Sequence, residues 1–161
     1  MIRKVTLADA PVITAIYNKY IEETTISFEV DPLTVSQMAE RIEEISAHFP
    51  YFVYEVNGQI VGYCYAHQWK ERAAYSKTLE TTIYLDSNFV HHGIGVILMK
   101  RLIEECRNAG YRALIACITE GNESSIGLHR RLGFEQVSCF KNVGTKFGRL
   151  LGVVDYELEL I

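Results

Sequence analysis

The chain has 161 residues, of which 48% are hydrophobic and 22% are charged, and its formal net charge is −4. This composition is typical of a globular protein and excludes disordered and fibrous classes, and the length predicts one domain over residues 1–161. The acidic balance argues against nucleic acid as a partner. The lack of a long apolar run or a typical signal peptide argues against a membrane.

The cysteines predict a reduced interior rather than a disulfide framework. The four cysteines are Cys64, Cys106, Cys117 and Cys139. They lie far apart in the sequence and form no C-x-x-C pair. Without an export signal, they are interpreted as mostly buried small hydrophobic residues. We therefore expect a cytoplasmic protein.

The N-terminal third predicts one short strand and two helices. Residues 2–6 alternate as a strand, and Thr6 and Asp9 can form a capping box for the helix that follows. Pro32 breaks the chain, and Thr34 and Gln37 can form a second capping box. Each helix has apolar residues at helical spacing on one face.

The rest of the chain predicts strands interrupted by two further helices. Residues 51–56 and 59–69 flank an Asn57-Gly58 pair that suits a type I′ hairpin turn. A strand over 78–85 precedes a helix ended by Gly110, and a strand over 112–119 should be buried on both faces. Asn122 can cap a helix over 123–132, and strands over 135–140 and 153–160 follow.

The predicted order βααβββαβαββ indicates a single mixed α/β fold. Its strands and helices are too interleaved for separate domains. We expect parallel pairing around the strands that flank the two C-terminal helices, and each of these helices should cross between neighbouring strands.

Two glycines stand where an apolar strand gives way to an amphipathic helix. Gly93 and Gly95 are poor helix formers, so their use at a helix entrance suggests that the backbone itself has a role. A glycine-rich turn at the positive end of a helix suits phosphate oxygens. A dinucleotide fingerprint would need a third glycine where Leu98 stands, and no Walker G-K-[ST] is present. A tight turn with close helix packing is the competing interpretation.

The whole chain resembles the GNAT superfamily of N-acetyltransferases. The resemblance depends on Glu80 in "LETTIYL", the loop "HHGIGV", Asn122 in "EGNESSIGLHRRLGF", and the element order. The segments "AIYNKYI", "ISFE", "WKERAAY" and "GTKFGRLLGVV" narrow it to the phosphinothricin and methionine sulfoximine acetyltransferase branch. The resemblance implies the GNAT acyl-CoA N-acyltransferase fold, a central mixed twisted sheet flanked by helices. It also implies acetyl-CoA as cosubstrate and a homodimer.

The resemblance also implies the residues that hold acetyl-CoA. The glycine loop should wrap the pyrophosphate through backbone amides, and free N–H groups of a splayed strand should lie beside the acyl group. These predicted cofactor-binding residues are Ile83, Tyr84, Leu85, His91, His92, Gly93, Ile94, Gly95, Val96, Asn122 and Ser125.

The sequence departs from the branch in two places. The loop opens with Val90, His91 and His92 where relatives carry Gln or Arg followed by small or basic residues, and Gly152 stands where an Asp is usual. A metal site at the paired histidines is disfavoured because adjacent side chains diverge and no Cys, Asp or Glu nearby completes a ligand set. We expect no metal.

Two side chains are candidates for the chemistry. Glu80 lies within an apolar strand and is the candidate general base that removes the proton from an amine. Its alternative is an ordinary solvated glutamate. His129 occupies the place where many GNAT enzymes carry a tyrosine near the thioester sulfur. It could protonate the departing thiolate, or it could be only a packed, hydrogen-bonded residue.

Substrate recognition should fall on the N-terminal helices and on "HQWKERAAY". Lys70 and Arg72 can bind a carboxylate, Phe28 and Tyr75 can form the wall of a side-chain pocket, and Thr82 lies on the same strand as Glu80. A solvated Lys-Glu-Arg loop is the alternative.

The sequence therefore predicts acetylation of the α-amino group of a small amino acid or analogue, by direct transfer. An acetyltransferase for protein N-termini or polyamines, and a non-catalytic acyl-CoA-binding sensor, are the competing functions.

Overall fold

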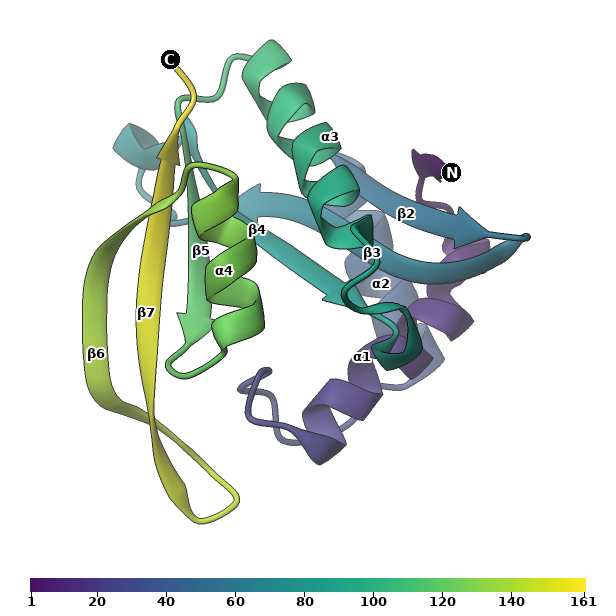
Figure 1. Ribbon diagram of the computed structural model, residues 1–161. Coiled ribbons are helices and arrows are strands. Elements are labelled where there is room, and N and C mark those ends of the chain that lie inside the picture. The colour runs from purple at the N-terminus through teal and green to yellow at the C-terminus, as the bar shows by residue number, and fades with distance from the viewer.

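A computed structural model describes all residues from Met1 to Ile161. Its elements follow the predicted order and form one seven-stranded sheet in the order β1-β2-β3-β4-β5-β7-β6 (Figure 1). The strands are β1 (Ile2–Lys4), β2 (Tyr51–Val56), β3 (Gln59–Gln68), β4 (Thr78–Leu85), β5 (Ala113–Thr119), β6 (Glu135–Lys146) and β7 (Arg149–Glu159). The helices are α1 (Ala10–Glu23), α2 (Val35–Ser46), α3 (Ile94–Asn108) and α4 (Glu123–Arg131).

The helices cover both faces of the sheet (Figure 1). Helices α1 and α2 lie on one face, over a cluster of 9 buried residues that includes Ile13, Met38 and Tyr63. Helices α3 and α4 lie on the other, over a larger cluster of 19 that includes Leu98, Leu102 and Leu114. The sheet is therefore the middle of three layers, which fits its apolar interior strands.

Local sequence signals set several element boundaries as expected. Thr34 Oγ1 accepts the Gln37 N–H at 3.1 Å, and Gln37 Oε1 accepts the Thr34 N–H at 2.9 Å, so the predicted capping box is present. Asn57 and Gly58 have φ angles of 51° and 78°, as a type I′ turn requires. Gly110 follows α3 with a φ of 88°, the left-handed value expected at a C′ position.

Strand β4 pairs in parallel with β5 over three residue pairs only, from Thr78–Ala113 to Glu80–Ile115. Beyond Glu80 the two strands diverge, while β4 stays paired with β3 up to Leu85. Helix α3 connects β4 to β5, and the parallel pairing predicted there is confirmed.

The C-terminal part differs from expectation. Helix α4 does not connect neighbouring strands, because β7 lies between β5 and β6 and pairs with both. The last two strands are longer than predicted, since they continue to a tight turn at Phe147 and Gly148, whose φ angles are 51° and 70°.

Only part of the cysteine prediction is confirmed. All four are free, but Cys117 and Cys139 are exposed and only Cys64 and Cys106 are buried. Cys117 is exposed because its side of β5 faces the space opened by β4.

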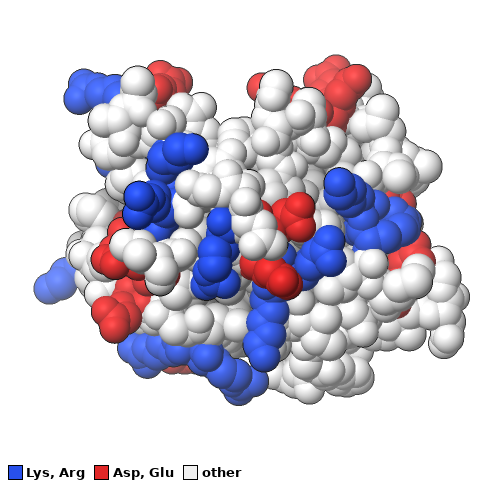
Figure 2. Space-filling view, turned by 90° about the horizontal axis from the view of Figure 1, so that it is seen from above, with Lys and Arg blue, Asp and Glu red and all other residues white.

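Surface charge is mixed on the face drawn in Figure 2, where basic side chains are interspersed with acidic ones. None of the helices has the length and apolar character needed to cross a bilayer.

Candidate active site

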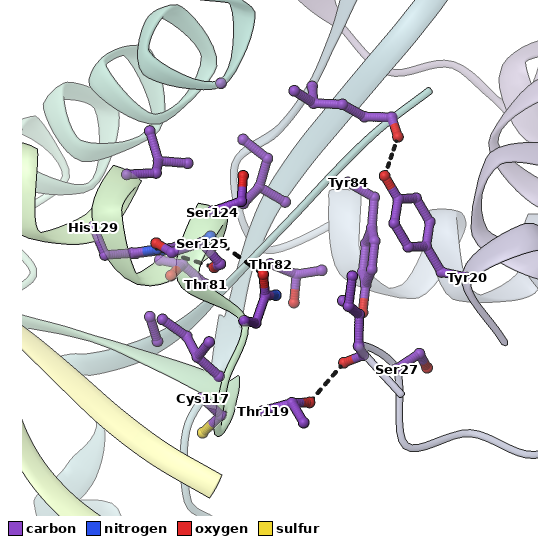
Figure 3. A pocket seen from close by; sticks show the side chains of 18 of the residues that line it. Tyr20, Ser27, Thr81, Thr82, Tyr84, Cys117, Thr119, Ser124, Ser125 and His129 are labelled. Atoms are coloured by element: carbon purple, nitrogen blue, oxygen red, sulfur yellow. Dashed lines mark hydrogen bonds between the residues drawn. The ribbon is translucent and has the colours of Figure 1, made fainter. Parts of the chain in front are cut away.

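A cavity of about 1160 Å³ occupies the space where β4 and β5 diverge. Its wall combines residues of α1, the segment before α2, strands β3 to β5, the loop before α3, and α4. Figure 3 shows polar side chains from these separate elements around one space, among them Tyr20, Thr82, Cys117 and Ser125. The topology therefore brings most of the predicted site residues together.

The divergence leaves main-chain groups of β4 without a strand partner. The Asp86 N–H donates to Val61 O at 2.8 Å, so by antiparallel alternation Tyr84 directs its main-chain groups to β3. Ile83 and Leu85 direct theirs to the other side, into the gap. Leu85 O accordingly accepts a hydrogen bond from Tyr20 OH on α1. Of the three predicted residues, Ile83 and Leu85 offer free N–H groups, whereas the Tyr84 N–H is used within the sheet.

The loop before α3 presents a run of unpaired donors. None of the seven main-chain N–H groups from Val90 to Val96 has an acceptor in the chain, and the first bond of the helix runs from Ile97 N–H to Gly93 O at 3.2 Å. His91 and Gly93 have φ angles of 63° and 81°, which curve the loop. Such donors at a helix N-terminus suit an anion.

Side chains of this loop contribute less than its backbone. His92 is exposed, Ile94 is buried in the core, and neither lines the cavity, whereas His91, Gly93, Gly95 and Val96 do. Nothing in the structure groups three or more His, Cys, Asp or Glu side chains as a metal site.

Helix α4 also lines the cavity. Asn122 Oδ1 accepts the Ser125 N–H at 3.3 Å and caps the helix, and both residues line the cavity. This capping bond fixes the direction of the helix N-terminus at the cavity wall.

His129 is buried on α4, with only 3% of its surface exposed. Its Nδ1 lies 2.7 Å from Ser125 O, which can only accept, so Nδ1 carries a proton and Nε2 is an acceptor. The ring packs edge-on against Phe134, with centroids 5.0 Å apart. Burial lowers the pKa of His129, so the ring is neutral at pH 7 and has no proton on Nε2 to give. The geometry thus supports the packed interpretation over the acid.

Glu80 is half-buried at the wall of the cavity, on β4. Its Oε2 lies 3.4 Å from His67 Nε2 on β3, and its Oε1 accepts a hydrogen bond from the Cys117 thiol on β5 at 3.6 Å. The hydrogen bond with Glu80 raises the pKa of His67, against the opposite effect of burial. Sequence reasoning missed both neighbours, because only the strand register places them beside Glu80.

The predicted substrate residues divide into two groups. Phe28 and Thr82 line the cavity. Lys70, Arg72 and Tyr75 do not: the Lys70 ammonium lies 4.3 Å from the Trp69 ring centroid, Tyr75 packs on the same ring, and Arg72 is exposed. The segment "WKERAAY" therefore lies outside this wall, with Lys70 and Tyr75 packed on Trp69, and its role in substrate binding stays a prediction.

The cavity wall instead contains an ion pair that the sequence did not reveal. Arg41 on α2 binds Glu29 through two hydrogen bonds of 2.6 and 2.9 Å, and both line the cavity. Tyr17 OH also donates to Glu29. No sequence signal could have paired these residues, which are brought together by the turn between α1 and α2.

Free donors at a helix entrance suit a phosphorylated ligand, and two free N–H groups beside a cavity carboxylate suit acyl transfer. Known proteins agree: a family described as "Acetyltransferase (GNAT) domain" matches residues 2–152. The chain therefore belongs to the GNAT acetyltransferases, and it is an N-acetyltransferase.

Relatives narrow the type within this family. The chain is 39% identical to phosphinothricin N-acetyltransferase of Alcaligenes faecalis, over 95% of this chain and 79% of that one. It is 34% identical to L-methionine sulfoximine/L-methionine sulfone acetyltransferase of Pseudomonas aeruginosa, over 99% and 94%. A crystal structure of a phosphinothricin acetyltransferase from Sinorhizobium meliloti in complex with acetyl-CoA superposes with a TM-score of 0.95 and 34% identity, over 99% of this chain and 87% of that one.

Proposed function

We propose that this enzyme transfers an acetyl group from acetyl-CoA directly to the α-amino group of a small amino acid or analogue, of the phosphinothricin or methionine sulfoximine type. Glu80 is the general base. The observation that carries the proposal is that a cavity carboxylate and two free N–H groups lie on one strand, where β4 parts from β5. The relatives named above support the substrate type.

The residues present fit acetyl-CoA. The free N–H groups of the loop residues that line the cavity would hold its pyrophosphate, and Asn122 and Ser125 would line its path along α4. When bound, acetyl-CoA supplies an activated acetyl thioester.

Glu80 handles the proton of the acceptor. An α-ammonium group titrates near pH 8 in model compounds, so at neutral pH most of the substrate must lose a proton before its nitrogen can attack. A carboxylate at the cavity wall can accept that proton directly or through one water. The free N–H groups of Ile83 and Leu85 face the gap and can donate to the oxygen on which negative charge develops.

His129 is not the acid in this proposal, because the neutral ring carries its proton on Nδ1 and directs it to Ser125 O. The thiolate that leaves is protonated by solvent. His129 instead holds α4 in place against Phe134.

The test is a thiol-release assay with Glu80→Gln. We expect kcat to fall about a hundred-fold, the scale of a lost general base, with acetyl-CoA affinity unchanged. Glu123→Gln, which neutralises an exposed carboxylate of the same cavity wall, is the matched control and should keep its rate. A Glu80→Gln enzyme with full rate and the same pH profile would refute the assignment.

One observation favours a second class of acceptor. Arg41 lines the cavity but already binds Glu29, so this guanidinium is not free to pair with a substrate carboxylate. Peptide N-termini and polyamines lack the neighbouring carboxylate of an amino acid. The assay should therefore compare amino acids, methionine sulfoximine and phosphinothricin with peptides and polyamines. A higher kcat/KM for the acceptors without a carboxylate would reverse the choice, and no thiol release with any acceptor would indicate a sensor.

We also propose a cytoplasmic homodimer. Large apolar side chains are exposed along β6 and its turn, namely Val137 (55%), Phe140 (51%), Val143 (60%), Phe147 (59%) and Leu150 (66%). Exposed large apolar side chains of this kind suit burial against a second copy of the chain. Light scattering should give twice the monomer mass, and Val143→Lys should shift the protein toward monomer.

A further inference from the structure

His67 is the nearest charged neighbour of Glu80. The two residues are register partners on β3 and β4, with Nε2 and Oε2 3.4 Å apart. The second ring nitrogen, Nδ1, lies 2.9 Å from the main-chain oxygen of Gln68. A carbonyl oxygen only accepts, so Nδ1 carries a proton and Nε2 is directed to the carboxylate.

A proton between the two side chains would make this contact attractive. A neutral ring with its proton on Nδ1 would set the Nε2 lone pair against a carboxylate oxygen, which is repulsive. With a second proton on Nε2, the ring becomes an imidazolium that donates to Oε2. The carboxylate raises the pKa of His67, and its hydrogen bond is the largest cause.

No cation from another strand competes for this carboxylate. Cys117 on β5 donates to Oε1, and beyond it Asp155 on β7 is the register partner of Cys117. On β3 itself, the Tyr65 ring lies 5.8 Å from the His67 ring, centroid to centroid. The groups around the pair are thus neutral or acidic, which favours a charged His67.

We propose that His67, as an imidazolium, is a positioning residue that holds the ionised Glu80 carboxylate at the acceptor end of the cavity. The inference rests on the proposed role of Glu80 as base. Each carboxylate oxygen has two lone-pair directions, so one on Oε2 serves His67 and one on Oε1 serves Cys117. The remaining directions are available to the amine or to a water.

The proton count closes over one turnover. At the start the pair holds one proton, on Nε2 of His67. When the substrate ammonium gives a proton to Glu80, the pair holds two, one on each side chain. Glu80 then releases this proton to solvent, and the pair returns to its first state. The second proton, which the nitrogen loses as the amide forms, also passes to solvent, and solvent protonates the departing thiolate.

Two variants of His67 separate positioning from packing. A glutamine at this position can place its amide nitrogen near that of Nε2 and still donate to Glu80, but it does not titrate. An asparagine is shorter, so its amide can reach only the Gln68 side. We expect His67→Asn to lower kcat about tenfold with acetyl-CoA affinity unchanged, because the carboxylate loses its support. We expect His67→Gln to keep kcat within about threefold.

The pH profile gives a readout that packing alone would not change. In the wild type the working form carries the imidazolium, so kcat should fall as pH rises through the raised pKa of His67. In His67→Gln this alkaline fall should disappear. An NMR titration of the His67 ring should also show its pKa move down when Glu80 is replaced by Gln.

The outcomes distinguish this inference from the proposed function. Full activity of Glu80→Gln would overturn the proposed function and this inference with it. Loss of activity in Glu80→Gln, with wild-type kcat and pH profile in both His67 variants, would overturn this inference alone. An unchanged His67 titration in Glu80→Gln would do the same.

Discussion

Replacing Gly95 with valine should separate cofactor binding from folding. A Cβ at this position would lie 3.4 Å from Leu128 Cδ2 and 3.7 Å from Leu85 Cδ1, which the packing accepts with little movement. Valine is also a better helix former than glycine, by about 0.5 kcal/mol, so the free energy of unfolding should change little. Gly95 also lines the cavity, so a valine side chain there would narrow the space in which CoA must approach the loop.

The expected loss of binding follows from the donors that the methyl groups displace. A hydrogen bond from a main-chain N–H to a charged oxygen contributes about 1.5–3 kcal/mol. Losing two costs about 3–6 kcal/mol, which corresponds to roughly 10²–10⁴-fold in Kd. Calorimetry with CoA should therefore show at least about a hundred-fold weaker binding.

Lys100→Val is the matched control, because it places the same residue on an exposed position of α3 away from the loop. It should bind CoA as the wild type does, and urea denaturation of both variants should check the fold. If Gly95→Val binds CoA with unchanged affinity, the backbone of this loop does not approach the pyrophosphate and the reasoning fails.

Three further changes test the fold around the site. Asp9→Asn should lower the free energy of unfolding by about 1–3 kcal/mol at pH 7, because Asp9 is buried and accepts two bonds from Arg3. The hydrogen bond from Arg3 lowers the pKa of Asp9 below 3.8, so this contribution to stability should be present above that pH and disappear as pH falls through the lowered pKa. Equal urea midpoints of the wild type and Asp9→Asn at pH 7 would contradict this. Asn122→Ala should cost about 1 kcal/mol of stability by removing the cap of α4, and Asn122→Asp should restore it in thermal melts. Gly152→Ala should lower the free energy of unfolding by about 1–3 kcal/mol, since its Cβ would lie 2.6 Å from the Phe140 main-chain oxygen. An unchanged melting temperature would show that β6 moves aside at little cost.

Local chemistry explains why much of the fold was predictable. The capping box at Thr34 and the type I′ turn at Asn57 need only neighbouring residues to specify them. The order of elements followed from the same short-range signals. The position of β7 between β5 and β6 is a long-range choice, and no periodicity within either strand encodes it.

The candidate site divides in the same way. Gly93 and Gly95 could be found because a helix entrance has a composition of its own. The pairing of His67 with Glu80 depends on the register of two strands, and that of Glu29 with Arg41 depends on how a turn folds back. Arg72 shows the opposite case: it is close to Glu80 in sequence, but it does not line the cavity.

The short ladder between β4 and β5 also has a mechanical consequence. Three residue pairs join the first four strands to the last three, as few as join the edge strand β1 to β2, so few hydrogen bonds hold the two halves of the sheet together. A ligand that accepts hydrogen bonds from the N–H groups of Ile83 and Leu85 would occupy the place of a paired strand at this point. Amide exchange of these two residues should be fast in the free enzyme and slow with acetyl-CoA bound. The cosubstrate would then join the two halves of the sheet as well as supply the acetyl group.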